Sequence, residues 1–329
     1  MSAANLKRID TLVLFTAAMS CMSACASSDE AEETSSKIAS LATLQRDGDN
    51  ASTRASPAAS GTFAIDELEH NAAVNAQGGH RVFSGGDGIL YGIKPNGDLL
   101  WYRHFDPGGG SNSWSANSGT KIGTGWSDFS SVLGNGDGVI YAIQPNGDLL
   151  WYRHLDPWVG SNSWAFATGV KIGSGWNTFS AVVAGSNGIL YGIRPNGDLL
   201  WYRHLDPLGG SNSWAANSGA KIGSGWNMFN SVVASSALYG IPSNGDLLWY
   251  QHLDPLGGSP SWAANSGAKV GIGWNVFSTV VAGGDGVFYG IPPNGDLLWY
   301  RHLDPWDGSA SWAANSGAKI GSGWNIFAR

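Results

Sequence analysis

The strongest constraint on this chain is a segment that recurs five times with few changes. It reads PNGDLLWYRHFDP at 95–107, and close copies begin at Pro145, Pro195, Ser243 and Pro293. The tyrosines just upstream fall at 91, 141, 191, 239 and 289, a period of 50 residues with one copy shortened to 48. A period of this length is typical of solenoids, propellers and arrays. Five near-equal surfaces favour binding several copies of a small ligand over a single asymmetric catalytic centre.

Composition favours many short strands. The chain has 48 Gly and 17 Trp but only 13% charged residues, and Gly weakens helices while aromatic residues suit pleated surfaces. Most of the formal net charge of −7 falls before residue 79, and many of the acidic residues there, such as Asp29, Glu30 and Glu32, lie before residue 60. From residue 79 onward there is no Glu, and Asp nearly balances Lys and Arg. Since no basic patch is present there, nucleic acid is not an expected partner.

The first 26 residues have the pattern of a signal peptide. Lys7 and Arg8 precede a short apolar run over Thr11–Met19, and small residues follow. The segment MSAC at 22–25 resembles a bacterial lipobox, which would lipidate Cys25 and tether the protein to a membrane. The alternative is ordinary cleavage after the Ala-Cys-Ala at 24–26. Both alternatives predict a secreted or cell-envelope protein.

Two further regions follow the signal. Residues 27–78 are rich in Ser, Ala, Glu and Asp with few aromatics, so they cannot bury enough apolar surface to offset the entropy of ordering. We predict that they form a disordered linker. Residues 79–329 hold the repeats and form the second predicted region, a single repeat domain.

Each repeat contains four short apolar runs, and the second repeat shows them well. They lie at Phe129–Leu133, Val139–Ile143 and Leu149–His154 and around 170–172. Asn-Gly in the turn at 145–148 is a strong hairpin signal. Four antiparallel strands repeated radially form a β-propeller. The predicted fold class is therefore all-β, a five-bladed β-propeller with four antiparallel strands per blade.

The two ends of the repeat region suggest how the ring closes. The last copy stops at 327–329, where its next strand would begin, and Arg81–Phe83 aligns with Ser131–Leu133. We therefore expect the N-terminal strand of the domain to complete the last blade and close the ring.

The repeat also carries a family resemblance. It contains Gly-x-Gly-Trp-x-x-Phe at 123–129, Val-Ile-Tyr-Ala-Ile at 139–143, Asn-Ser-Trp at 162–164 and Lys-Ile-Gly at 171–173. This order and spacing, over about 79–329, resembles the tachylectin-2 family of five-bladed propeller lectins. The resemblance implies binding of N-acetylated hexosamines (N-acetylglucosamine or N-acetylgalactosamine type), one per blade, in pockets between adjacent blades. Where that family has Asp-Asn-Trp and a following Arg, this chain has Ser-Asn-Ser-Trp at 111–114 and Asn117, which leaves the sugar identity open.

Carbohydrate pockets pair an aromatic platform with fixed polar groups, and the repeat supplies candidates for both. We predict the loop tryptophans as platforms, because loops at propeller edges carry function, although a Trp that recurs in every blade is more often part of the core between blades than a ligand platform. These residues are Trp114, Trp164, Trp214, Trp262 and Trp312. The Trp126 set offers another platform, and the Trp101 set of the third strand is expected in the core.

The polar candidates are amides and imidazoles. The asparagines before the loop Trp are Asn112, Asn162 and Asn212, and those after it are Asn117, Asn217, Asn265 and Asn315. The histidines are His104, His154, His204, His252 and His302. For the histidines the alternative is structural, a His–Asp pair such as His104 with Asp106 that braces the loop.

Metal and catalytic sites are not expected. Gly-Asp-Gly at 86–88 offers one carboxylate per repeat and is lost in the fourth copy, whereas Ca²⁺ needs several oxygen ligands. Glycoside hydrolysis usually needs two carboxylates flanking the bond, and no nucleophile–base arrangement is present. We therefore predict a lectin without cofactor or metal that is not an enzyme, with up to five weak sites that gain avidity together. The alternative is a protein-interaction scaffold of the cell envelope that binds no sugar, with partner-specific loops.

Overall fold

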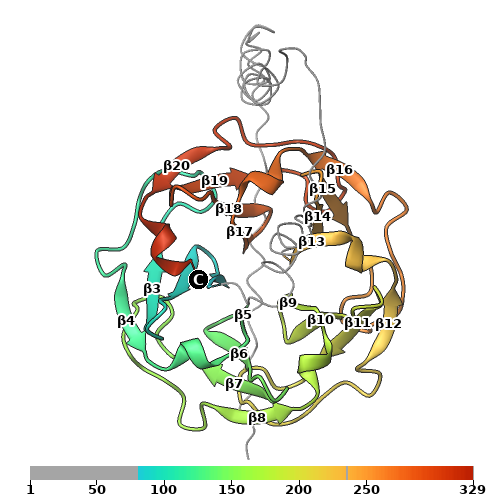
Figure 1. Cartoon of the computed structure of the whole chain (residues 1–329), viewed down its shortest axis with the longest axis horizontal. Coiled ribbons are helices and arrows are strands. Elements are labelled where there is room, and N and C mark those ends of the chain that lie inside the picture. The colour runs from blue at the N-terminus through green and yellow to red at the C-terminus, as the bar shows by residue number, and fades with distance from the viewer. Residues whose placement is uncertain (1–80, 235, 329) are drawn as a thin grey trace, which may run out of the picture. The chain divides into compact units, whose positions relative to one another are not determined.

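A computed structural model describes residues 81–234 and 236–328 of the chain (Figure 1). These residues fall in one compact unit, Ala64–Arg329. The predicted signal peptide at 1–26, its Cys25 and the predicted linker at 27–78 lie outside the described residues. Within the described ranges, no helix is long and apolar enough to cross a membrane.

The described residues form five four-stranded antiparallel sheets, which we call the first to fifth blades. The first blade contains β1 (Val82–Gly86), β2 (Ile89–Ile93), β3 (Leu99–Arg103) and β4 (Thr120–Gly123). The second contains β5 (Ser131–Gly136), β6 (Val139–Ile143), β7 (Leu149–Arg153) and β8 (Val170–Gly173). The third contains β9 (Ala181–Ala184), β10 (Ile189–Ile193), β11 (Leu199–Arg203) and β12 (Ala220–Gly223). The fourth contains β13 (Phe229–Ala234), β14 (Leu238–Pro242), β15 (Leu247–Tyr250) and β16 (Ala268–Gly271), and the fifth β17 (Thr279–Gly284), β18 (Val287–Ile291), β19 (Leu297–Arg301) and β20 (Ala318–Gly321).

The five blades stand around a central axis, which confirms the predicted propeller (Figure 1). The first strand of each blade lies nearest the centre and the fourth lies at the rim (Figure 1). Between the five inner strands is an apolar space of about 80 Å³, lined by side chains such as Val132, Val182 and Val232. The inner strands thus meet through small apolar residues.

One short 3-10 helix follows each fourth strand. These helices are η1 (Trp126–Asp128), η2 (Trp176–Thr178), η3 (Trp226–Met228), η4 (Trp274–Val276) and η5 (Trp324–Phe327). The amide of Trp126 donates to the carbonyl of Gly97 in the β2–β3 turn at 3.0 Å, so the helices and these turns share one face, the helix face. At the other end, His104 N donates to the carbonyl of Gly88 in the β1–β2 turn at 2.8 Å. The β3–β4 loops and the β1–β2 turns therefore form the opposite face, the loop face.

The Asn-Gly turn predicted from the sequence joins the second and third strands as expected. Asn96 Oδ1 accepts from the amide of Asp98 at 3.0 Å, and Gly97 has φ of 85°, which favours glycine. Lys121 Nζ lies 2.7 Å from the Asp98 carboxylate and ties the turn to β4. Asp98 therefore stabilises the hairpin.

The main core lies between blades. The third strand presents Trp101, fully buried, to the second blade, where it packs with Val132 and Ile140. Its neighbours Leu100 and Tyr102 pack in the opposite direction, against the fifth blade. Every third strand repeats this arrangement, so the prediction that these tryptophans are core is confirmed. They are Trp101, Trp151, Trp201, Trp249 and Trp299.

The prediction for ring closure is wrong in its detail. β1 pairs with β2 inside the first blade, and the fifth blade has its own inner strand, β17. The tight turn at 86–88 joins β1 directly to β2, so the N-terminal strand cannot reach another sheet.

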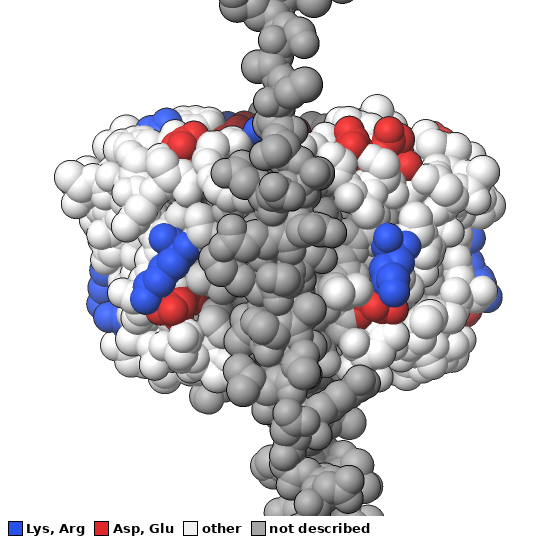
Figure 2. Space-filling view, turned by 90° about the horizontal axis from the view of Figure 1, so that it is seen from above, with Lys and Arg blue, Asp and Glu red and all other residues white. Residues whose placement is uncertain are grey.

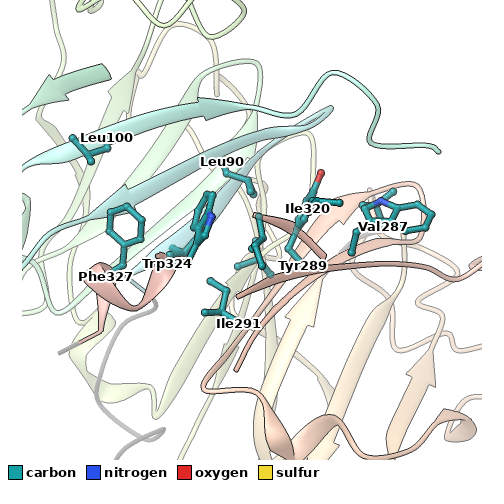
Figure 3. Close-up of a cluster of buried hydrophobic side chains, with 12 residues drawn as sticks. Leu90, Leu100, Val287, Tyr289, Ile291, Ile320, Trp324 and Phe327 are labelled. Carbon is teal, nitrogen blue, oxygen red and sulfur yellow. The ribbon is translucent and has the colours of Figure 1, made fainter. Parts of the chain in front are cut away.

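The ring closes instead through side chains of η5 (Figure 3). Phe327 fills the space above Gly92 of β2, where an added Cβ would come within 2.4 Å of its ring. The ring centroid of Trp324 lies 4.7 Å from that of Tyr102 in β3. The same contact recurs where the chain passes from one blade to the next, for example Phe179, which follows η2, on Gly192 of β10.

Truncating Phe327 tests this closure. Because Phe327 is only 3% exposed, we expect Phe327→Ala to lower the free energy of unfolding by about 3 kcal/mol, within the range for buried Phe. Phe166→Ala is the control, since Phe166 is fully exposed and its loss should change little. Denaturant titration of both variants provides the measurement. Equal stability of the two would contradict closure through η5.

Candidate functional site

The predicted site residues meet at the junctions between blades rather than within one repeat. Trp114 Nε1 donates to the carbonyl of Ile320 in the fifth blade at 2.7 Å. Asn315 of the fifth blade donates through Nδ2 to the carbonyl of Gly109 in the loop that precedes Trp114, at 2.7 Å. This junction therefore combines the Asn of one repeat with the Trp of the next. The sequence does not show this, because Trp114 and Asn117 lie in the same loop.

The loop of each blade is held by side chains of the preceding blade. At the junction of the third and fourth blades, three consecutive carbonyls of the loop, those of residues 255–257, each accept one hydrogen bond. The donors are Trp201 at 2.9 Å, Arg203 at 3.1 Å and Asn217 at 2.6 Å. We call this set the loop clamp. It fixes the distance between the two blades at the loop face.

The loop clamp is complete at only some junctions. The Trp bond is present at all five, and the Arg bond at four. At the junction of the fourth and fifth blades, Gln251 replaces Arg and donates through Nε2 to the carbonyl of the adjacent His252 at 3.3 Å. The Asn bond is made by Asn217, Asn265 and Asn315, and the second blade has Ala167 instead.

The loop tryptophans are half-buried and use their indole nitrogen on the neighbouring blade. The acceptors are the carbonyls of Ile320, Ile122, Ile172, Ile222 and Val270. In three loops the preceding Asn also accepts, as Asn112 Oδ1 does from Trp114 Nε1 at 3.0 Å. These tryptophans contribute to the junction while part of each ring stays accessible. Their role as sugar platforms remains a prediction.

The histidines are buried, with both ring nitrogens engaged. His104 is 1% exposed, its Nε2 lies 2.7 Å from the carbonyl of Ser111, and its Nδ1 lies 3.1 Å from the hydroxyl of Tyr289 in the fifth blade. Because a carbonyl only accepts, Nε2 carries the proton and Nδ1 accepts from the tyrosine hydroxyl. Burial lowers the pKa of His104, which favours this neutral form.

The same geometry holds at His154, His204, His252 and His302. The structure therefore fits the bracing alternative and leaves these imidazoles no accessible group for a ligand. The brace runs through the carbonyl of Ser111 rather than through Asp106, whose carboxylate accepts from the amides of Gly109 and Ser111. Sequence reasoning missed this because it cannot show which backbone carbonyl faces a side chain.

Several polar groups remain available at the junctions. Asn112 uses Oδ1 on Trp114, so its Nδ2 is a free donor among the described residues, and Asn315 has a free Oδ1. The junction of the first and second blades has the matching pair Asn162 and Asn117. At the other three junctions one amide is replaced, by Ala167, Pro260 or Ala310. No group of three His, Cys, Asp or Glu able to hold a metal occurs in the described part of the chain.

The tyrosine–histidine pairs predict a pH-dependent stability. Burial lowers the pKa of all five histidines below the ordinary value of 6.5. Between the lowered pKa and 6.5 the unfolded chain binds more protons than the folded one. The stabilisation is therefore complete above about pH 6.5 and is lost as the pH falls below it. The pKa of Asp106 is held below 3.8 chiefly by its hydrogen bond to Ser111. The stabilisation that the ionised Asp106 carboxylate provides is therefore lost only at a lower pH.

Urea unfolding at about pH 7.5, 6.5 and 5.5 measures this effect. We expect the free energy of unfolding to fall across this series, with proton uptake by several histidines on unfolding. A constant or rising stability towards pH 5.5 would contradict the assigned tautomers.

Comparison with known proteins agrees with the geometry. The Tachylectin family model matches residues 69–231. No curated protein matches the chain. Among solved structures, the SapL1 lectin in complex with alpha methyl fucoside shares 14% identity with a TM-score of 0.38, covering 73% of this chain and 81% of that one.

Two further structures are similar at the same level. Prp20p from Saccharomyces cerevisiae shares 12% identity with a TM-score of 0.35, over 71% of this chain and 63% of its own. The computationally designed Ika8 protein shares 10% identity with a TM-score of 0.29, over 72% and 63%. This chain therefore spans less than two thirds of the length of either. The matched repeats continue in the same pattern to residue 327 and build a five-bladed propeller, so this chain is a tachylectin-like five-bladed propeller.

Proposed function

We propose that this propeller binds N-acetylated hexosamines at the junctions of its blades, up to one sugar per junction. The observation that carries the proposal is a half-buried loop Trp at the same junction as two side-chain amides. At the junction of the fifth and first blades these residues are Asn315, Asn112 and Trp114. The match to the Tachylectin family model supports a binding protein rather than an enzyme.

The chemistry of an acetamido group suits this arrangement. Its N–H needs an acceptor, which Asn315 Oδ1 provides, and its carbonyl needs a donor, which Asn112 Nδ2 provides. The accessible part of the Trp114 ring offers an apolar surface to the C–H face of the sugar. Both amides are already fixed by their other atoms, so little side-chain entropy is lost on binding.

The five junctions are not equivalent in this proposal. The junctions of the fifth with the first blade and of the first with the second carry both amides. The remaining three lack one amide, through Ala167, Pro260 or Ala310. We therefore propose two stronger and three weaker sites, which gain avidity together on a surface that displays many sugars. The signal predicts that the protein acts either as a secreted protein or at the cell envelope, where a lipidated Cys25 would tether it.

Titration calorimetry with N-acetylglucosamine and N-acetylgalactosamine tests the proposal. We expect weak binding, with about two stronger sites per chain. A fourfold variant should lower the affinity of those sites about tenfold or more, because each lost hydrogen bond contributes about 1 kcal/mol. It combines Asn112→Ala, Asn162→Ala, Asn117→Ala and Asn315→Ala. Met228→Ala is the control, since Met228 is 57% exposed on η3 of the helix face.

A folded protein that binds neither sugar would overturn the proposal. Binding that the fourfold variant leaves unchanged would place the site elsewhere. The second candidate function is a protein scaffold, favoured by Trp158 and Trp306, which are 43% and 66% exposed in loops that differ from the others. A stoichiometric protein partner that free N-acetylglucosamine does not displace would favour that function.

A further inference from the structure

The repeats neutralise their lysines but not the arginines of their third strands. Each lysine of the fourth strand lies against the aspartate of the β2–β3 turn, as Lys121 does with Asp98 at 2.7 Å. On the side that Figure 2 shows, basic and acidic side chains lie next to each other. No carboxylate of the described residues pairs with the third-strand arginines. These are Arg103, Arg153, Arg203 and Arg301.

Each of these guanidinium groups is held in place by a hydrogen bond from its Nη1 atom. Nη1 of Arg301 donates to the carbonyl of Gly108 at 2.8 Å, and Nη1 of Arg103 donates to that of Trp158 at 2.8 Å. The Nε atoms of Arg153, Arg203 and Arg301 are buried and have no hydrogen-bond partner. A buried donor without a partner is costly. The guanidinium is therefore oriented by the protein, and because Nε is buried, a ligand would bind the remaining Nη hydrogens.

The arginines belong to the same junctions as the amides of the proposed sugar site. Arg301 and Asn315 donate to consecutive carbonyls of one loop, those of Gly108 and Gly109. The nearby Asp106 carboxylate is occupied by the amides of its own loop. An unneutralised cation thus lies beside the position assigned to the acetamido group.

Apolar side chains flank the guanidinium. Arg103 lies over the rings of Phe105 and Trp158, at 5.3 and 4.9 Å from their centroids. At the next junction the equivalent residues are Leu155 and Leu208, each 47% exposed. Apolar walls strengthen the attraction between the cation and an anionic group that replaces water there. They also offer a surface for a sugar ring.

We infer that the preferred ligand is an acetamido sugar that also bears a carboxylate, with the carboxylate on Arg103, Arg153, Arg203 or Arg301. The planar fork of Arg matches a carboxylate, and such charge-assisted bonds are about twice as strong as neutral ones. This inference rests on the proposed binding of N-acetylated hexosamines and narrows its ligand class. The junction of the fourth and fifth blades is an internal contrast, because Gln251 stands in place of the arginine.

The test compares N-acetylglucosamine with N-acetylmuramic acid, which keeps the ring and acetamido group and adds a carboxylate. With the purified full chain at low salt, we expect the acidic sugar to bind about tenfold more tightly, with the preference shrinking as salt rises. In the variant Arg103→Gln, Arg153→Gln, Arg203→Gln, Arg301→Gln the ratio of the two affinities should fall to about one. Gln is the residue that the fourth repeat already carries, and thermal unfolding checks the fold.

The outcomes separate this inference from the proposed function. Equal affinity of the unaltered chain for both sugars would overturn the inference and leave the proposed function standing. Binding of neither sugar would overturn both. A preference that persists in the fourfold variant would assign the carboxylate to other groups and overturn the inference. If that variant does not fold, Gln251→Arg replaces it. It should raise the amount of acidic sugar bound at saturation, and no increase would overturn the inference.

Discussion

The side chains of the third strands hold this ring together, because the five blades of the described chain share no strand pairing. The Trp of each third strand donates to a loop carbonyl of the next blade. The His that follows the strand bonds to a Tyr of the preceding blade. Both bonds lie in a dry interior, where an unmade hydrogen bond is costly. The loop-face geometry follows from them, since Trp101 and Arg103 position the neighbouring loop.

The local parts of the fold could be predicted from the sequence, because they depend on neighbouring residues. The Asn96-Gly97 turn and the apolar runs around it determine the hairpins, and the 50-residue period determines the number of blades. The closure could not be predicted by aligning the chain ends, since Phe327 closes the ring by packing on Gly92, a contact between distant residues. The residue types of the candidate site could be predicted from the sequence, but which residues meet at one junction could not. Trp114 and Asn117 are neighbours in sequence, yet the loop Trp and the loop Asn serve opposite junctions.

The near-identity of the repeats has a structural reason, since the residues most often repeated also join the blades. The imidazoles and the Trp101 set are buried at every junction. The positions that vary, such as Ala167, Pro260 and Gln251, lie in the loop clamp or next to the loop Trp. Variation there removes single hydrogen-bonding groups and leaves the ring intact. A repeat protein can thus keep one architecture while the junctions between its blades diverge in hydrogen-bonding groups and charge.

The most direct test is a crystal structure of the protein with N-acetylglucosamine. We expect the acetamido group between Asn315 and Asn112, with the sugar ring on Trp114, and an equivalent sugar at Asn117, Asn162 and Trp164. A sugar bound in the central space or on the helix face, with these amides unoccupied, would contradict the proposed site.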